Sequence, residues 1–301
     1  MKLVVICGAT ATGKSELAVK TAKRLNGEVI SCDAFLVYRG LNIGTAKSTK
    51  EEMGGIPHYM IDVASPLEKF SVSDFERLAL PILNDITARN KVPILCGGTG
   101  FYMNALLYAQ SFGNAPANQE VRSKYERILE EQGKEHLHSL LEGVDPESAE
   151  ILHVNDTVRV IRALEIYELT GRKKSEQNDE KIPRFPFESF AFDYPRQELY
   201  ARIEQRVDRM IEAGLVEEVE GLLQSGVSEN AQCMQGIGYK EVVEFLKNGQ
   251  LQSTMSDIIK KNTRNYAKRQ LTFFKRTENL HLLQPRKIDE AVEEIVKIYE
   301  S

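Results

Sequence analysis

The chain has 301 residues, of which 42% are hydrophobic, and a net charge of −5, so it can bury a sizeable core in one or two domains. No apolar run approaches the roughly 20 residues that span a bilayer, and the four cysteines lack metal-binding or disulfide spacing. These features exclude a membrane protein, a zinc protein and a disulfide scaffold. We expect a cytoplasmic protein with no obligate protein partner.

A glycine-rich loop directly follows the apolar run at residues 3–7. It consists of Gly8, Ala9, Thr10, Ala11, Thr12, Gly13, Lys14 and Ser15. Between a strand and a helix, such a loop turns backbone N–H groups toward phosphate oxygens, while its lysine reaches the terminal phosphates and its serine ligates Mg²⁺. We therefore predict a phosphate-binding, nucleotide-binding type of loop with Ser15 as the metal ligand. The alternative is a glycine-rich turn with a solvated lysine.

The next predicted elements are a helix at residues 16–25 and a strand at 28–32, which ends at Asp33. In doubly wound sheets, ligands bind beyond the carboxyl ends of the strands, so Asp33 is expected close to the phosphate loop. This position makes it the best acid or base candidate of the chain. The alternative is an aspartate that caps a turn or a helix.

A structured loop is predicted at residues 38–47, a third strand at 58–63, an amphipathic helix at 73–89 and a fourth strand at 92–96. Many P-loop hydrolases end a later strand in an aspartate that holds Mg²⁺. Here the fourth strand continues instead into Cys96, Gly97, Gly98 and Thr99. Asp33 is thus the predicted acid near the phosphates, and a motor or switch protein is disfavoured.

Four helices are predicted in succession after the fourth strand, at residues 119–131, 134–142, 146–153 and 157–170. The last carries Arg159 and Arg162 on one face, either for phosphate contact or as solvated side chains. The sequence thus predicts an α/β fold: a P-loop-like core with a parallel sheet at residues 1–112 and 185–301, and a helical insertion domain at 113–184.

Basic residues concentrate in the last third of the chain. After a fifth strand at 187–194 and helices at 197–213 and 216–225, a helix is predicted at 254–276; residues 258–277 hold seven basic residues and no acidic one. Lys260, Arg264 and Lys268 follow i, i+4 spacing and form a stripe. The stripe suggests an anionic partner such as nucleic acid, with a solvated helix face as the alternative.

These residues together resemble the tRNA dimethylallyltransferases, also called tRNA isopentenyltransferases, in their bacterial form. The resemblance covers essentially the whole chain and involves residues 8–15, 31–34, 38–47, 57–58, 62, 97–102, 155–156, 159, 162–165, 238–240 and 268–270. It implies transfer of the dimethylallyl group from dimethylallyl diphosphate to N6 of the adenosine beside the anticodon, position 37, in the anticodon stem-loop of tRNA. The loop would then hold the leaving diphosphate with Mg²⁺ rather than ATP.

The resemblance also implies roles for single residues. Asp33 matches the general base and Thr99 a threonine beside the donor diphosphate, while Arg206 is our choice for the diphosphate-binding arginine, with Arg202 as its rival. The positions that match tRNA-contacting segments are Asp33, Ala34, Phe35, Leu36, Val158, Arg159, Arg162, Gln235, Gly238, Tyr239, Lys240, Lys268, Arg269, Gln270 and Lys275.

Two rival functions fit part of the pattern. A small-molecule or nucleoside kinase also has a P-loop, an aspartate after the second strand and a helical lid, but it needs no basic stripe near the C-terminus. A noncatalytic RNA-binding switch would use the loop for nucleotide occupancy, and its RNA affinity would not depend on Asp33.

Overall fold

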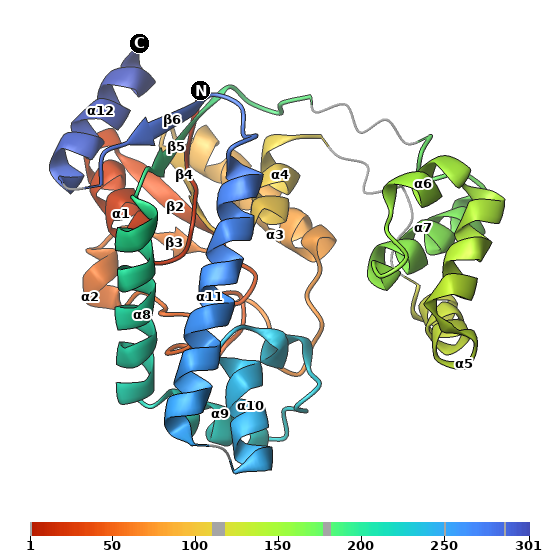
Figure 1. The fold of residues 1–301 in the computed structure, drawn as a ribbon. Helices are drawn as coiled ribbons and strands as arrows, with labels where there is room; N and C mark the ends of the chain where they lie inside the picture. The colour runs from red at the N-terminus through yellow and green to blue at the C-terminus, as the bar shows by residue number, and fades with distance from the viewer. Residues whose placement is uncertain (1, 110–117, 177–181, 250, 286) are drawn as a thin grey trace. The chain divides into compact units, whose positions relative to one another are not determined.

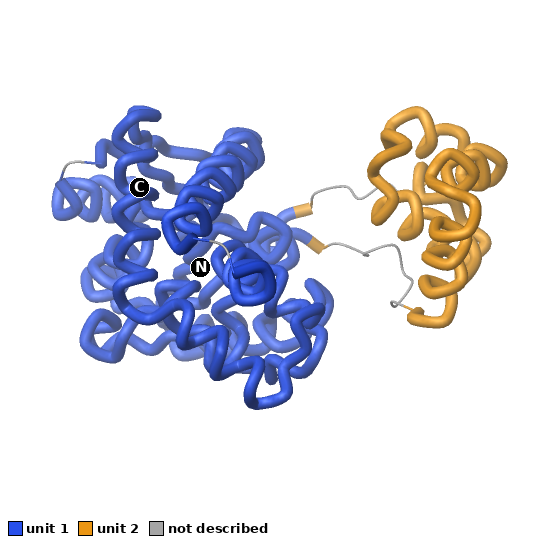
Figure 2. Tube along the Cα trace, turned by 60° about the horizontal axis from the view of Figure 1, so that its bottom comes forward, with its two compact units in different colours: residues 1–108, 183–301 blue, residues 109–182 orange. Residues whose placement is uncertain are grey.

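The computed structural model describes residues 2–109, 118–176, 182–249, 251–285 and 287–301. The chain divides into two compact units, one of Met1–Tyr108 with Pro183–Ser301 and one of Ala109–Ile182 (Figure 2). The boundary predicted between residues 112 and 113 lies outside the described residues. The one predicted between 184 and 185 lies close to the change of unit after Ile182.

The larger unit is built on a six-stranded sheet in the order β3-β2-β4-β1-β5-β6, in which all neighbouring strands run parallel (Figure 1). A parallel sheet is covered on both faces, so its strands are apolar along their length. The predicted α/β class is confirmed. The strands are β1 (Leu3–Ile6), β2 (Gly27–Cys32), β3 (His58–Tyr59), β4 (Val92–Gly97), β5 (Phe187–Phe192) and β6 (Leu280–Leu283).

Alternate residues of β1 enter two separate cores, because successive side chains of a strand point to opposite faces. Val4 and Ile6 pack with α1 and α12, whereas Leu3 and Val5 belong to the larger core on the other face, with α3, α4, α9 and α10. The helices of this unit are α1 (Lys14–Leu25), α2 (Lys50–Met53), α3 (Val72–Ala88), α4 (Gly100–Leu107), α8 (Arg196–Glu212), α9 (Leu215–Gln224), α10 (Tyr239–Asn248), α11 (Gln252–Phe274) and α12 (Ile288–Glu300).

The strand order brings three loops to one edge of the sheet. Because β2, β4 and β1 are neighbours and parallel, the loops after their carboxyl ends lie side by side. The phosphate loop follows β1, Asp33 follows β2, and Gly98 and Thr99 follow β4. The sheet therefore positions the predicted site.

The predicted strand at residues 58–63 is wrong in its length. Only His58 and Tyr59 pair with β2, because Met60 and Asp62 have φ angles of 63° and 56°, which extended strands do not adopt. The strand β6 and the helices α2, α4, α10 and α12 have no counterpart among the predicted elements.

The smaller unit is helical, with α5 (Gln119–Val144), α6 (Pro146–Ile151) and α7 (Thr157–Thr170). Gly133 has φ 84° and ψ 171° and breaks α5 where the sequence predicts two helices. At its centre Glu165 is fully buried and accepts hydrogen bonds from Asn118 N at 2.7 Å, Arg122 Nε at 2.9 Å and Arg162 Nη1 at 2.6 Å. Within the described ranges, no helix is both long and apolar enough to cross a membrane.

Candidate active site

The phosphate loop is a closed turn at the end of β1. Gly8 and Gly13 have φ angles of 124° and 88°, which favour glycine, and Gly13 caps the start of α1. The Thr12 hydroxyl donates to the Ala9 carbonyl at 2.9 Å, and the Lys14 ammonium donates to the same carbonyl and contacts the Thr12 hydroxyl oxygen at 3.5 Å. The loop thus has the shape of a phosphate cradle, with the N-terminus of α1 at its end.

Gln270 joins this loop to the loop after β4. Its Oε1 accepts from Thr10 N at 2.9 Å, and its Nε2 donates to the Gly98 carbonyl at 2.9 Å. The side chain is 5% exposed. Gln270 thus holds the two loops together and also lines the cavity beside the phosphate loop, while the tRNA contact that the resemblance implies for it stays a prediction.

Two cavities meet above the sheet. The first, of about 190 Å³, is lined by the phosphate loop, including Lys14 and Ser15. The second, of about 280 Å³, is lined by residues of the 235–240 segment and α11, including Gln235 and Lys240. Both cavities are lined by Thr10, Asp33, Thr45, Arg206 and Tyr266. A ligand of the phosphate loop and a ligand of the second cavity would therefore meet at these residues.

Asp33 lies on this shared wall with a fixed carboxylate. Its Oδ1 accepts from Phe35 N at 2.9 Å and from Leu36 N at 3.3 Å, so the turn-capping alternative also holds. The two interpretations are compatible, because one oxygen holds the turn and the second remains for proton transfer. Ala34 N donates to the Thr99 hydroxyl at 3.0 Å. Thr99 lines neither cavity, so the structure places it as a support of the Asp33 turn.

Arg206 and Arg202 take different positions on α8. Arg206 Nη2 donates to the Thr45 carbonyl at 3.0 Å, and the side chain lines both cavities. Burial lowers the pKa of Arg206, and the nearby Asp33 carboxylate opposes this effect. Arg202 Nε donates to the Ala11 carbonyl at 2.8 Å, and its guanidinium lies 5.0 Å from the Tyr194 ring centre. The geometry thus favours Arg206 over its rival for an anion on the shared wall.

Lys14 is a weakened base in this site. Burial, the largest cause, and the nearby Arg206 lower its pKa to about 8, while Asp33 acts in the opposite direction. A bound diphosphate would favour the charged form, so binding above that pH must take up a proton. The affinity is then greatest below about pH 8 and falls as the pH rises above it.

We expect the affinity for inorganic diphosphate with Mg²⁺ to fall above pH 8, by up to about tenfold per pH unit until the pKa of Lys14 in the complex is reached. Titration calorimetry between pH 6.5 and 9.5 measures it. Lys14→Arg is the control, since arginine stays charged throughout and the titration of the ligand is common to both proteins. An identical pH profile for the two would contradict the prediction.

The second cavity gathers part of the residues predicted to contact tRNA. Phe35, Gln235 and Lys240 line it, and the last two are exposed. Gly238 has φ 99° and turns the chain into α10. Tyr239 also lines the cavity but is 1% exposed, and its hydroxyl donates to Glu218 at 2.7 Å. Its hydroxyl therefore serves the packing of the loop rather than the surface.

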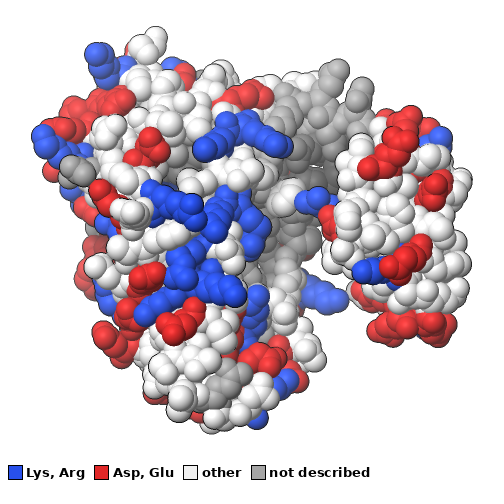
Figure 3. Space-filling model, in the orientation of Figure 1, with Lys and Arg blue, Asp and Glu red and all other residues white. Residues whose placement is uncertain are grey.

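Basic side chains gather over α8 and α11 (Figure 3). The predicted stripe on α11 is divided, because Lys260 pairs with Asp208 at 2.6 Å and Arg264 pairs with Glu204 at 2.7 Å. Both acids belong to α8, so these two cations help to join the helices. Along α11 and at its C-terminal cap, the exposed basic residues of the predicted tRNA-contacting set are Lys268, Arg269 and Lys275.

In the smaller unit, the three residues predicted to contact tRNA differ in exposure and in their ion pairs. Val158 is 78% exposed, and Arg159 is exposed with Asp156 at 3.2 Å. Arg162 is bound to the buried Glu165. We therefore expect Arg162 to stabilise this unit in addition to any contact with RNA.

Tyr266 lies among the basic residues of the predicted helix, where an aromatic ring could stack on a base, but no motif assigns it to the shared wall. It precedes Gln270 by one turn of α11, which places both on one face of the helix, and this spacing is the signal that could have found it. Burial raises its pKa to about 12, so its hydroxyl remains protonated. Across the described ranges, no group of three or more His, Cys, Asp or Glu residues could hold a metal ion.

Comparison with known proteins identifies the family. A family model described as IPP transferase matches residues 36–277. The tRNA dimethylallyltransferase of Acetivibrio thermocellus is 42% identical over 298 residues, 98% of this chain and 95% of the relative. That of Caldanaerobacter subterraneus is 47% identical over 281 residues, 91% of this chain and 89% of the relative.

Solved structures agree with this result. The tRNA isopentenylpyrophosphate transferase of Bacillus halodurans is 40% identical, with a TM-score of 0.71 over 100% of this chain and 99% of that chain. A eukaryotic dimethylallyltransferase acting on tRNA is 29% identical, with a TM-score of 0.84 over 99% of this chain and 78% of that chain. The resemblance seen in the sequence is confirmed, and a kinase is not favoured: the chain belongs to the IPP transferase family.

Proposed function

We propose that this enzyme transfers the dimethylallyl group from dimethylallyl diphosphate to N6 of the adenosine at position 37 of tRNA and releases diphosphate. The proposal rests on the names of the relatives and on one observation of the site. Asp33 lines both the phosphate-loop cavity and the second cavity, so it lies where a donor and an extruded base would meet. Such an enzyme would work on tRNA in the cytoplasm.

The chain's own residues suit each part of this reaction. The N6 nitrogen forms a bond to C1 of the donor as the bond from C1 to the diphosphate oxygen breaks, and the proton from N6 goes to the free oxygen of Asp33. The leaving diphosphate gains charge, which the backbone N–H groups of the loop, Lys14 and Arg206 would neutralise. The proposed proton acceptor and the proposed cations thus all line the cavities in which the reaction would take place.

Magnesium is part of the proposal. Ser15 is in the first turn of α1 and lines the donor cavity beside Lys14. One hydroxyl, together with diphosphate oxygens and water, suits the octahedral oxygen coordination of Mg²⁺. Ser15 would hold the ion, and the ion would supply further neutralisation of the leaving diphosphate.

The test uses unmodified tRNA with labelled dimethylallyl diphosphate in one reaction and labelled ATP in another. We expect label in tRNA only from the prenyl donor, at the adenosine beside the anticodon. Label that moves only from ATP would support a kinase and overturn the proposal. RNA binding without transfer from either donor would support a noncatalytic protein instead.

On α11, Lys268 is exposed whereas Lys260 pairs with Asp208, and this difference gives a prediction about tRNA binding. We expect Lys268→Ala to weaken tRNA binding and to lower the slope of log K against log salt by about one, because an exposed cation that contacts a phosphate releases a counterion. Lys260→Ala is the matched comparison, since Lys260 pairs with Asp208 and should change the slope less. Filter binding between 50 and 200 mM salt measures both. Equal slopes for Lys268→Ala and wild type would remove Lys268 from the interface.

A further inference from the structure

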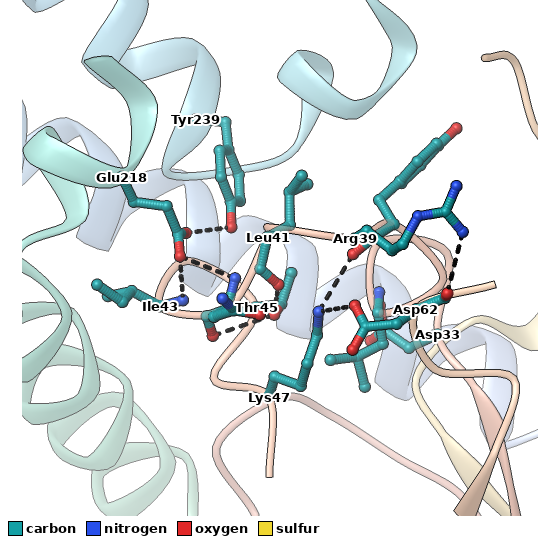
Figure 4. A network of polar contacts seen from close by, with 12 residues as sticks. Asp33, Arg39, Leu41, Ile43, Thr45, Lys47, Asp62, Glu218 and Tyr239 are labelled. Carbon is teal, nitrogen blue, oxygen red and sulfur yellow. Dashed lines mark hydrogen bonds and ion pairs between the residues drawn. The ribbon is translucent and has the colours of Figure 1, made fainter. Parts of the chain in front are cut away.

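Glu218, on α9, holds the loop at residues 41–47 through one carboxylate (Figure 4). Its Oε2 accepts from Asn42 N and Ile43 N, each at 2.8 Å, and its Oε1 accepts from Gly44 N at 3.1 Å. The Tyr239 hydroxyl donates to Oε1 at 2.7 Å. Three consecutive backbone N–H groups that converge on one anion fix the conformation of the loop.

Tyr239 and Gly44 pack closely beside the contact between Glu218 and the loop. A Cβ atom at Gly44 would lie 2.5 Å from Tyr239 Cε2, so the loop can approach the ring only with glycine at this position. Burial raises the pKa of Tyr239, and the Glu218 carboxylate raises it further. The phenol therefore stays protonated and donates to Glu218, and the loop, α9 and α10 form one packed unit.

The loop that Glu218 holds contacts Arg206 directly. The Thr45 carbonyl accepts from Arg206 Nη2 at 3.0 Å. Within the described ranges, the guanidinium makes no other hydrogen bond. The Thr45 hydroxyl donates to the Leu41 carbonyl at 2.7 Å, so Thr45 moves with the loop. An arginine has five N–H donors. Those that Thr45 does not occupy remain for a ligand in the two cavities that Arg206 lines.

We propose that Glu218 is a positioning residue for donor binding: by fixing residues 42–45 it orients Arg206 toward the diphosphate. The inference rests on the proposed function only in taking diphosphate as the ligand. Glu218 belongs to no motif of the sequence and is not among the residues that the resemblance predicts. Its effect would pass through the Thr45 carbonyl rather than through contact with the donor.

The test measures binding of inorganic diphosphate with Mg²⁺ by calorimetry. We expect Glu218→Gln to raise its dissociation constant about tenfold, because the amide replaces one acceptor oxygen by donors that face backbone N–H groups. Glu220→Gln, at an exposed position of the same helix, is the control and should change nothing. The melting temperature of each variant separates positioning from unfolding. Tyr239→Phe removes one donor, keeps the carboxylate, and should weaken binding about two- to threefold.

Combining Glu218→Gln with Arg206→Ala tests whether Glu218 affects diphosphate binding through Arg206. If Glu218 acts through Arg206, the substitution has little further effect once the arginine is gone, because the two changes share one interaction. Unchanged diphosphate binding in Glu218→Gln, or the same weakening with and without Arg206, would overturn the inference. Absence of prenyl transfer in wild type, with diphosphate binding that still depends on Glu218, would overturn the proposed function alone.

Discussion

Asp33→Asn is expected to lower the rate of prenyl transfer to tRNA about 10²- to 10⁴-fold, the usual contribution of a positioned general base. Asparagine keeps the Oδ1 acceptor that Phe35 N and Leu36 N require, so the turn should remain intact. Its amide cannot take the proton from N6. Single-turnover reactions with labelled donor measure the rate, and we expect donor and tRNA affinities to change by less than about threefold.

Two further variants make this result specific. Asp257→Asn removes a carboxylate from an exposed position on α11 and should leave the rate unchanged. Asp33→Ala removes the turn acceptor as well as the base, so it should add a loss of stability that Asp33→Asn does not show. Wild-type turnover in Asp33→Asn would exclude Asp33 as the base and leave it only its turn-capping role.

The position of Asp33 could be predicted because it follows from topology. Apolar runs at residues 3–7, 28–32 and 92–96 predict parallel strands, and parallel strands present their following loops at one edge of the sheet. A motif at the end of each strand is therefore enough to predict that the phosphate loop, Asp33 and Gly98 are neighbours. Local sequence carries this information, because the strands are short and buried on both faces.

The supports of the site could not be predicted, because they join residues far apart in the chain. Gln270 contacts Thr10 across 260 positions, and Glu218 contacts Asn42 across 176. Neither glutamine nor glutamate on a helix has a local pattern that distinguishes a buried clamp from a solvated side chain. The strand β6 pairs with β5 across 91 positions, as between Ser189 and Leu280.

The basic helix shows the same limit in its electrostatics. Spacing of four residues predicts that Lys260, Arg264 and Lys268 share a face, but it says nothing of what that face meets. The structure brings α8 against it, and Asp208 and Glu204 neutralise two of the three cations. Which charges remain for a partner depends on the neighbouring helix, so it follows only from the tertiary structure.

Lys14→Met is expected to lower kcat/KM for the prenyl donor about 10²- to 10³-fold, the typical loss when one group that stabilises developing charge is removed. Methionine keeps most of the length of the side chain without its charge. In the proposed reaction the leaving diphosphate gains charge as the C1–O bond breaks, so Lys14 stabilises the transition state more than the bound donor. The loss should therefore fall on kcat as well as on KM.

Steady-state rates at saturating tRNA and varied donor concentration separate the two parameters. Lys297→Met, at an exposed position on α12, is the matched control and should behave as wild type. Lys14→Arg keeps the charge but not the compact ammonium, and we expect it to recover binding of diphosphate more than turnover. If Lys14→Met raised KM alone and left kcat unchanged, Lys14 would bind the donor without stabilising the departing diphosphate. The loop would then serve as a binding site for the ground state, and Arg206 would remain as the cation on the shared wall that meets the developing charge.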